Sequence, residues 1–218
     1  MDNLFLAGLD PARCRDVLQL TVRRRYRKGD TLFHEGDPGN SLHMLVKGFV
    51  AIRTTTFKGD TATLAVLGPG DFFGEQALIS VGAIRSASAV AIDPVETMAL
   101  RAADFEQLRD ADPRVDRLLL AALGVQVRRL SAQLAEALYL PAETRVVRRL
   151  RDLADVFGAD SSETVVIPIT QEDLSTMAGT TRPTTNQVLQ ELVAKGVVQL
   201  ARGRIDVVDV TLLRRLAR

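Results

Sequence analysis

The chain has 218 residues, of which 46% are hydrophobic and 25% are charged, and its formal net charge is +1. This composition is that of a globular protein of one or two domains that buries a core, and it excludes disordered and fibrous classes. The balance of 28 basic and 27 acidic residues provides no overall attraction to nucleic acid or membrane. Any DNA binding must therefore depend on where individual basic side chains lie.

The N-terminus and the rarest residues narrow the setting further. Met1-Asp2-Asn3 lacks the basic start of a signal peptide, and the longest apolar run, residues 118–125, is far shorter than the roughly 20 residues of a membrane span. We therefore expect a cytoplasmic protein without a membrane partner. The single cysteine, Cys14, excludes an internal disulfide and any cluster built from several cysteines. Cys14, His34 and His43 have no partners at metal-ligand spacing, so we expect structural roles for them.

Turn signals cut the sequence at short intervals between Tyr26 and about Met98. They combine glycine with lysine, aspartate, proline or asparagine, at residues 28–30, 36–40, 47–48, 58–60 and 68–71. The segments between them are rich in apolar and β-branched residues, at 42–46, 49–56 and 61–67. Short strands at this spacing predict an antiparallel sandwich or barrel, most simply a small β-roll, with a short helix over residues 11–20 before it.

Residues 74–87 contain the groups needed to hold a cyclic phosphodiester. Gly74-Glu75-Gln76-Ala77-Leu78 is followed after six residues by Arg85-Ser86-Ala87. Backbone N–H groups beside a glycine can approach a phosphate closely, a guanidinium can neutralise its charge, and a serine hydroxyl can donate to it. A carboxylate can accept from a sugar hydroxyl, so the pattern predicts a ligand site and not a catalytic one. The alternatives are a surface salt bridge for Arg85 and a turn cap for Glu75.

A long helix is expected from Pro113 to about Leu138. Asp112 can cap it, Pro113 suits the first helical position, and the helix would be about 39 Å long. A stripe at spacings of three and four contains Val115, Leu119, Ala122, Gln126, Leu130, Gln133, Leu134 and Ala137. A helix this long can outrun its own β-roll, so we expect it to pair with a second copy in a homodimer. The alternative is an internal core helix.

The C-terminal part begins after Pro141, which marks a hinge. An amphipathic helix over 143–157 and a β-branched run over 164–169 come first. Thr170 can cap a brief helix, residues 178–180 make a tight turn, and Thr181 can cap a second helix that runs from Arg182 to Lys195. Two short helices joined by a glycine turn predict a helix-turn-helix, whose second helix enters the major groove of DNA.

The expected DNA-binding face combines the two helix starts with a wing. Val188, Leu189, Leu192 and Val193 are expected to face inward. Strands at 197–200 and 205–208 would form a hairpin, the wing. Side chains that read base edges or hold phosphates are expected at Thr170, Thr180, Thr181, Arg182, Thr184, Thr185, Asn186, Gln187, Arg202 and Arg204. The alternative is a plain helical pair with a hairpin.

Taken together, these residues resemble the family of the cyclic-AMP receptor protein and the fumarate–nitrate regulator, the CRP/FNR family of bacterial transcription regulators. Three motifs in the family's order carry the resemblance: FHEGDPG at 33–39 with Gly48, GEQALISVGAIRSA at 74–87, and GTTRPTTNQVLQEL at 179–192. The motif at 74–87 resembles the family's phosphate-binding cassette, and the motif at 179–192 resembles its recognition helix. The resemblance covers nearly the whole chain.

The family implies a homodimer in which the β-rolls bind an effector, the long helices form the interface and the winged domains fit two DNA half-sites. By position, Glu75 would hold a ribose 2′-hydroxyl, Arg85 and Ser86 the cyclic phosphate, and Gly74 the close backbone turn. The implied effector is cyclic AMP, with cyclic GMP or another nucleotide as alternatives. Double-stranded DNA with a two-fold symmetric operator and RNA polymerase are the implied partners.

Two departures from the family pattern affect the expected specificity, one for the effector and one for the DNA operator. On the long helix, Leu130 and Ser131 stand where cyclic-AMP binders of the family place a threonine and a serine over the base. In the recognition helix, Pro183 and Gln187 replace a glutamate and a second arginine, so a different operator is expected.

We therefore expect an α+β protein: a cyclic-nucleotide-binding-like β-roll at 1–110, a dimerisation helix and hinge at 111–140, and a winged helix-turn-helix at 141–218. Its expected function is sequence-specific DNA binding controlled by a cyclic nucleotide or similar effector, without enzymatic activity. The alternatives are a regulator of the same fold that needs no effector, and a nucleotide-sensing interaction module that contacts protein instead of DNA.

Overall fold

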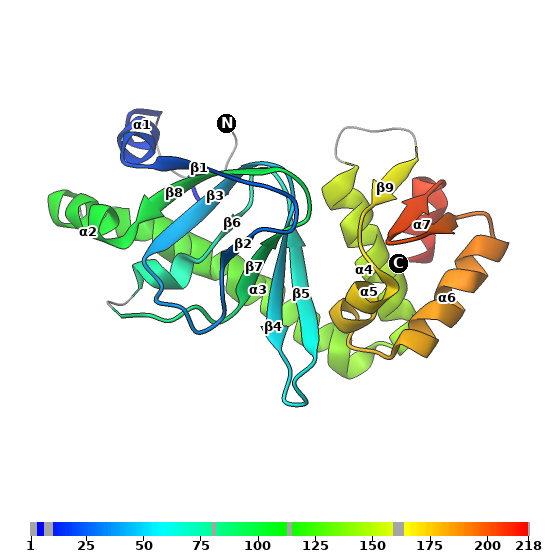
Figure 1. Ribbon diagram of the computed structural model, residues 1–218. Coiled ribbons are helices and arrows are strands. Elements are labelled where there is room, and N and C mark those ends of the chain that lie inside the picture. The colour runs from blue at the N-terminus through cyan, green and yellow to red at the C-terminus, as the bar shows by residue number, and fades with distance from the viewer. Residues whose placement is uncertain (1–3, 7–10, 80–81, 113–114, 159–163, 218) are drawn as a thin grey trace. The chain divides into compact units, whose positions relative to one another are not determined.

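The computed structural model of the chain describes residues 4–6, 11–79, 82–112, 115–158 and 164–217. It has the expected α+β composition, and the chain packs as two compact units (Figure 1). The first contains residues 1–55 and 67–130, and the second contains residues 56–66 and 131–218. Among the residues at which predictions were made, Met1–Asn3, Ser80, Val81 and Pro113 lie outside the described ranges.

Two four-stranded antiparallel sheets build the β-roll. Their strand orders are β1-β8-β3-β6 and β2-β7-β4-β5. The strands are β1 (Val22–Tyr26), β2 (Thr31–Phe33), β3 (Ser41–Lys47), β4 (Val50–Thr55), β5 (Thr61–Leu67), β6 (Phe72–Phe73), β7 (Ser88–Ala91) and β8 (Val95–Arg101). The three strand segments expected from the turn pattern coincide with β3, β4 and β5, which confirms that part of the prediction.

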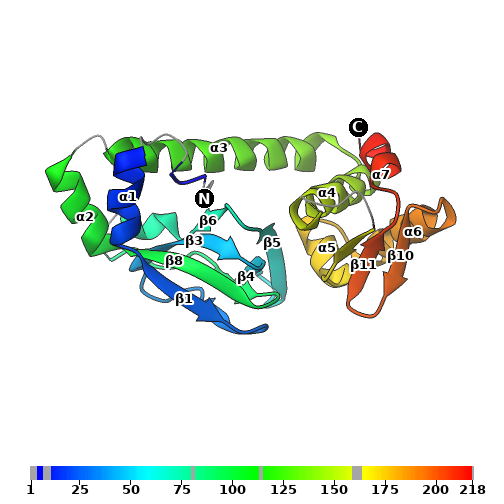
Figure 2. The same ribbon diagram turned by 90° about the horizontal axis from the view of Figure 1, so that it is seen from above.

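A helical layer covers one face of the first sheet (Figure 2). It consists of α1 (Pro11–Gln19), α2 (Ala102–Ala111) and the beginning of α3 (Asp116–Tyr139). Because side chains alternate along a strand, Leu42 and Met44 of β3 both face this layer. They form one core with Phe5 and Phe105, whose ring centroids are 6.4 Å apart. Cys14 packs against the same core, as expected for a small apolar residue.

The apolar residues of α3 form a buried group and an exposed group. The sequence analysis had placed members of both groups in a single stripe. Residues from the N-terminal half of the helix and just before it are buried in the β-roll core: Val115, Leu118, Leu119 and Ala122. A second group is exposed by at least 60%: Leu120, Val127, Leu130, Leu134 and Leu138. The assignment of Leu119 to one stripe with Leu130 is therefore wrong, since Leu119 fills the protein's own core and Leu130 does not.

The second unit contains four helices and a three-stranded sheet among its described residues. The helices are α4 (Ala142–Phe157), α5 (Gln171–Met177), α6 (Arg182–Ala194) and α7 (Val210–Leu216). The sheet has the order β10-β11-β9, with β9 (Val165–Ile167), β10 (Val198–Ala201) and β11 (Arg204–Val207). The helix-turn-helix and its wing are thus formed by α5, α6 and the β10–β11 hairpin.

Helix caps hold the two helices of this motif in place. The Thr170 hydroxyl accepts from the Asp173 N–H, and the Asp173 carboxylate accepts from the Thr170 N–H, which completes a capping box. Thr181 caps α6 by accepting from the Thr184 N–H, and Gly179 turns the chain between the helices with φ 59°. Both predicted caps are confirmed. None of the described helices is long and apolar enough to cross a membrane.

Candidate functional site

The predicted cassette begins at a glycine that no other residue can replace without strain. Gly74 precedes a 3₁₀ helix (η1, Glu75–Leu78) and adopts φ 77°, in the left-handed region. A Cβ atom at this position would lie 2.5 Å from Nη1 of Arg85 and 3.0 Å from the carbonyl oxygen of Ser41. The absence of a side chain at Gly74 therefore allows Arg85 to pass directly beneath the turn.

Arg85 is a buried cation, with only 6% of its surface exposed. Its Nη1 donates to the carbonyl oxygens of Ser41 (2.8 Å) and Gly74 (3.3 Å), and its Nη2 donates to the Ser41 hydroxyl (3.2 Å). The guanidinium carbon lies 4.0 Å from the centre of the Phe33 ring, in cation–π geometry. All three acceptors are neutral oxygens, and Nε is buried without a hydrogen-bond partner in the described part of the chain. The alternative of a surface salt bridge for Arg85 does not fit this arrangement.

The remaining cassette residues differ in exposure. Glu75 is partly buried, and burial raises the pKa of its carboxyl, partly offset by a hydrogen bond from its own N–H and by Arg85. Ala77 is buried and Ala87 is partly buried, whereas Gln76 and Ser86 are exposed. The structure brings Gly74 and Arg85 into contact and leaves the Ser86 hydroxyl accessible next to them in the chain. Leu130 and Ser131 are exposed on α3, and their place in an effector site stays a prediction.

Phe33, which contacts the Arg85 guanidinium, belongs to an aromatic cluster inside the roll with His43 and Phe73. The His43 ring stacks on Phe73 at 5.3 Å with an interplanar angle of 9°, and Phe33 lies 5.9 Å from each of these rings. His43 is hydrogen-bonded to the hydroxyls of Ser41 and Thr97, both at 3.2 Å. Its role is structural, as expected. The sequence analysis missed Ser41 as a partner of Arg85, although its alternation with His43 on one strand places both on one face.

Burial is the main reason that His43 is neutral. It lowers the pKa of His43 from 6.5 to about 4, with further lowering by the positive charges of Arg85 and Arg24. For Arg85, burial lowers the pKa, while Asp37 and Glu75 act in the opposite direction. Two arginines therefore act as positive charges on His43 inside the roll, and two carboxylates partly offset the charge of one of them, Arg85.

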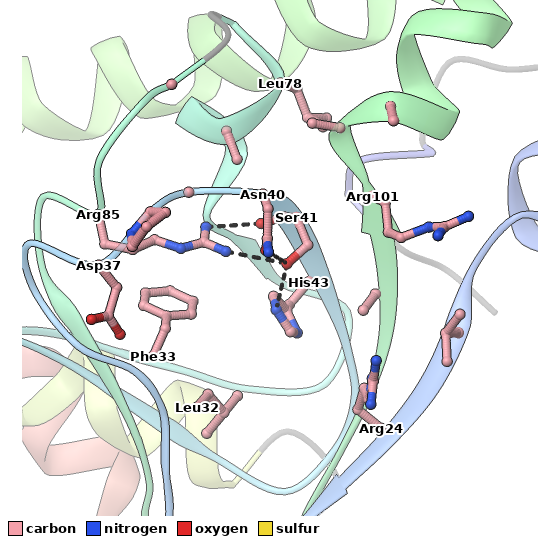
Figure 3. A pocket seen from close by; sticks show the side chains of 18 of the residues that line it. Arg24, Leu32, Phe33, Asp37, Asn40, Ser41, His43, Leu78, Arg85 and Arg101 are labelled. Carbon is pink, nitrogen blue, oxygen red and sulfur yellow. Dashed lines mark hydrogen bonds between the residues drawn. The ribbon is translucent and has the colours of Figure 1, made fainter.

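A cavity of about 770 Å³ opens next to Arg85 and the aromatic cluster (Figure 3). Arg85 and Ala77 are the residues that it shares with the predicted effector site, and Glu75 and Ser86 do not line it. In Figure 3 the Arg85 guanidinium points toward Asn40 and Ser41 at the centre of the cavity.

The start of α6 presents polar side chains to solvent. Arg182, Asn186 and Gln187 are exposed, as predicted. Thr181 is also exposed, but its hydroxyl is engaged in the cap and lies 3.0 Å from that of Thr184. Thr170 is exposed as well, and its hydroxyl is engaged by Asp173.

Two residues of α6 face the opposite way from the prediction. Thr185 is completely buried, and Val193 is 38% exposed. Thr185 shares the buried helix face with Val188, Leu189 and Leu192, because spacings of three, four and seven residues bring side chains onto one side. The expectation that Thr185 is exposed to DNA is therefore wrong, and the spacing alone could have revealed it.

The wing presents two arginines at the β10–β11 turn. Arg202 and Arg204 are both exposed, and Gly203 between them adopts φ 72°. Nε of Arg204 lies 3.2 Å from the Asp206 carboxylate. Arg202 is thus the more available of the two for a phosphate contact. In the described ranges, no group of three His, Cys, Asp or Glu side chains is placed to hold a metal ion.

Two known domain families match this chain. Residues 23–112 match the cyclic nucleotide-binding domain, and residues 144–216 match the Crp-like helix-turn-helix domain. The chain is therefore a DNA-binding transcription regulator with a cyclic nucleotide-binding domain, and not an enzyme.

Individual relatives define the family more narrowly. The chain is 35% identical over 211 residues to the cyclic AMP receptor protein of Thermus thermophilus, covering 96% of this chain and 94% of that protein. It is 29% identical to the CRP-like cAMP-activated global transcriptional regulator of Mycobacterium tuberculosis, covering 97% and 95% of the two chains. The crystal structure of the Thermus thermophilus catabolite activator protein matches with a TM-score of 0.57 at 33% identity, covering 99% and 98%. The chain belongs to the CRP/FNR family.

Proposed function

We propose that this protein is a homodimeric transcription regulator whose binding to a two-fold symmetric operator is controlled by a cyclic nucleotide, with cyclic AMP as the first candidate. The observation that carries the effector proposal is the buried Arg85 guanidinium, whose acceptors are all neutral oxygens. A buried cation is costly unless an anion compensates it, and a cyclic phosphate would supply that anion.

The neighbouring groups suit the rest of a cyclic nucleotide. The exposed Ser86 hydroxyl can donate to the phosphate, and the Gly74 turn allows the backbone of η1 to approach it. Glu75 carries a partly buried carboxylate that can accept from a ribose hydroxyl. Relatives named as cyclic-AMP-responsive support the choice of nucleotide. Cyclic GMP or another nucleotide is the alternative, because Leu130 supplies no hydroxyl for the base.

The exposed side chains of α3 support a homodimer. Val127, Leu130 and Leu134 follow one another at spacings of three and four, and Leu120 precedes Val127 by seven residues. This is the repeat of a two-stranded coiled coil, in which the partner's helix buries such a seam. The dimerisation helix and hinge would occupy residues 111–140, between an effector domain at 1–110 and a DNA-binding domain at 141–218. A regulator of this kind would act in the cytoplasm, with RNA polymerase as the further partner.

Calorimetric titration with cyclic AMP and cyclic GMP tests the effector proposal. Replacing Arg85 by glutamine should weaken binding by about 10- to 100-fold, because the charge-assisted bonds to the phosphate are lost. Arg25→Gln is the matched control, since the Arg25 side chain is 75% exposed and pairs with Glu96. It should leave the affinity within about twofold.

Two outcomes would contradict the proposal. Equal affinity of wild type and Arg85→Gln would show that the phosphate binds elsewhere. Binding of neither nucleotide to the wild type, together with specific operator binding, would favour a regulator that needs no effector.

A further inference from the structure

The cavity in Figure 3 has a wall that, apart from Arg85, the predicted effector site does not use. This wall is formed by β1, the inner face of β3 and β8, the loop before β3 and the start of α2. Its polar side chains come from Arg24, Tyr26, Asn40, Ser41, His43, Arg85 and Arg101, with Asp37 and Glu106 as its acidic members.

Strand alternation explains why one arginine of β1 faces this cavity and its two neighbours do not. Arg24 pairs in register with Thr97 of β8, and Thr97 is hydrogen-bonded to His43 on the inner face of the sheet. Arg23 and Arg25 lie on the opposite face, where Glu96 forms ion pairs with both, at 3.1 Å each. The three consecutive arginines are thus divided between two faces: Glu96 forms ion pairs with Arg23 and Arg25, and no described carboxylate pairs with Arg24.

Charges from both sides of the cavity act on the groups at its centre. Arg24 and Arg85 both lower the pKa of His43, adding to the effect of its burial. The same two arginines oppose the rise in the pKa of Tyr26 that burial causes. Two positive charges from different elements therefore converge on one cavity.

Among the other charged groups of the lining, Asp37 partly offsets the charge of Arg85, because it acts against the lowering of the pKa of Arg85 by burial. Arg101 is held by both carboxylate oxygens of Asp104, at 2.7 and 2.8 Å. An Asp37 oxygen accepts from the His34 N–H at 2.8 Å. Glu106 is exposed on α2. Arg24 and Arg85 are left as the cations available to a ligand.

We propose that this cavity is a second ligand site, which takes a small molecule carrying a phosphate group between Arg24 and Arg85. Two guanidinium groups with the Ser41 and Tyr26 hydroxyls and the Asn40 amide offer several donors to one group, which suits the several oxygens of a phosphate. Val22, Leu32 and Ala99 provide an apolar wall for the remainder of the molecule. A volume of about 770 Å³ is within the range of small-molecule sites and is large enough for a mononucleotide.

A shared residue would couple this site to the effector site. Arg85 lies in the wall between them, and one guanidinium cannot satisfy two anions fully. A phosphate compound in the cavity should therefore weaken cyclic-nucleotide binding, and the reverse effect must be equal. This coupling rests on the proposed function, whereas the existence of the second site does not.

The test is calorimetric titration of the full chain with inorganic pyrophosphate and with 5′-AMP, using adenosine as the uncharged comparison. We expect at least one phosphate compound to bind the wild type, and adenosine to give no binding. Arg24→Gln should weaken that binding at least tenfold. Arg25→Gln removes the same charge from the other face of the strand, where Arg25 pairs with Glu96. This variant should bind within twofold of the wild type.

Three results would overturn the second site. They are no binding of either phosphate compound, equal losses in Arg24→Gln and Arg25→Gln, and no loss in Arg24→Gln. A final titration adds cyclic AMP with and without pyrophosphate. Competition that disappears in Arg24→Gln supports the coupling, and unchanged affinity for cyclic AMP contradicts it. If cyclic AMP does not bind while pyrophosphate binds through Arg24, the proposed effector is wrong and the second site stands.

Discussion

The buried side chain of His43 makes the stability of the folded protein depend on pH. Its ring stacks on Phe73, and its two nitrogens are hydrogen-bonded to the hydroxyls of Ser41 and Thr97. Burial lowers its pKa from 6.5 to about 4. Between these two values the unfolded chain binds more protons than the folded chain does. The stabilising contribution is therefore complete above pH 6.5 and is lost as the pH falls toward 4.

We predict that wild-type stability falls by up to about 3 kcal/mol more than that of His43→Gln between pH 7 and pH 4, since each pKa unit corresponds to about 1.4 kcal/mol. Urea unfolding at several pH values measures this difference. The same replacement at the exposed His34 controls for the change of residue type. Parallel pH profiles for wild type and His43→Gln would contradict the prediction.

Thr185 carries a polar group where the helix needs an apolar one. Its side chain is fully buried, and its hydroxyl oxygen has no hydrogen-bond partner among the described residues. Burying a hydroxyl without a partner costs free energy, and valine has nearly the same shape without this cost.

We predict that Thr185→Val raises the free energy of unfolding by about 1 kcal/mol and leaves operator affinity unchanged. Urea unfolding and a DNA titration check the two parts. The partly buried Thr184 provides the matched position, since Thr184→Val changes the same side chain on the polar side of α6. A loss of operator affinity specific to Thr185→Val would show that this residue contacts DNA after all.

At the scale of single elements, α3 carries one buried and one exposed group of apolar side chains. Leu118, Leu119 and Ala122 belong to the roll core, whereas Leu130 and Leu134 are at least 60% exposed. A substitution at Leu119 would disrupt folding and would not report on dimerisation.

We predict that Leu130→Glu combined with Leu134→Glu yields folded monomers, because each introduced carboxylate would be buried opposite its own copy. Light scattering measures the oligomeric state, and circular dichroism checks the fold. Ala132→Glu places the same charge on an exposed position outside the seam and should keep the dimer. A dimer that survives the double substitution would place the interface elsewhere.

At the scale of the whole molecule, the proposed recognition of a two-fold symmetric operator would require two copies of the helix-turn-helix. Two recognition helices in successive major grooves would contact half-sites about 34–36 Å apart. Arg182 is exposed at the start of α6, where we expect base edges to be read, and Arg202 is exposed on the wing, where we expect phosphates to be held.

We predict that selection from random DNA yields a two-fold symmetric site. Arg182→Ala should cost on the order of 1–3 kcal/mol on this site and relax its sequence preference. Arg202→Ala should weaken all sequences about equally and reduce the salt dependence of binding by about one counterion. The measurement is fluorescence anisotropy at several salt concentrations. Equal weakening of all sequences by Arg182→Ala would show that α6 is not the reading helix.

Local sequence patterns by themselves determined several strands, the two helix caps and the cassette of this protein. Turn glycines delimited β3, β4 and β5, and the threonine caps positioned α5 and α6, because a turn or cap depends on residues close together in the chain. The cassette was visible for the same reason, as its parts lie within residues 74–87. The helix α2 was missed because Arg101 at its start provides no side-chain cap. The helix α7 was missed although Asp209 is a preferred N-cap residue and accepts from the Leu212 N–H.

Only the tertiary structure decided which neighbours these residues meet. Ser41 is 44 positions from Arg85. The pairing of β1 with β8 placed Arg24 opposite Thr97, on the face of the sheet that carries His43, and placed Arg23 and Arg25 near Glu96. Contacts between distant strands depend on sheet order and register, which a single sequence does not specify. The burial of a side chain is also decided by the tertiary structure. Leu119 is buried and Leu130 is exposed because the β-roll covers only the side of α3 on which Leu119 lies.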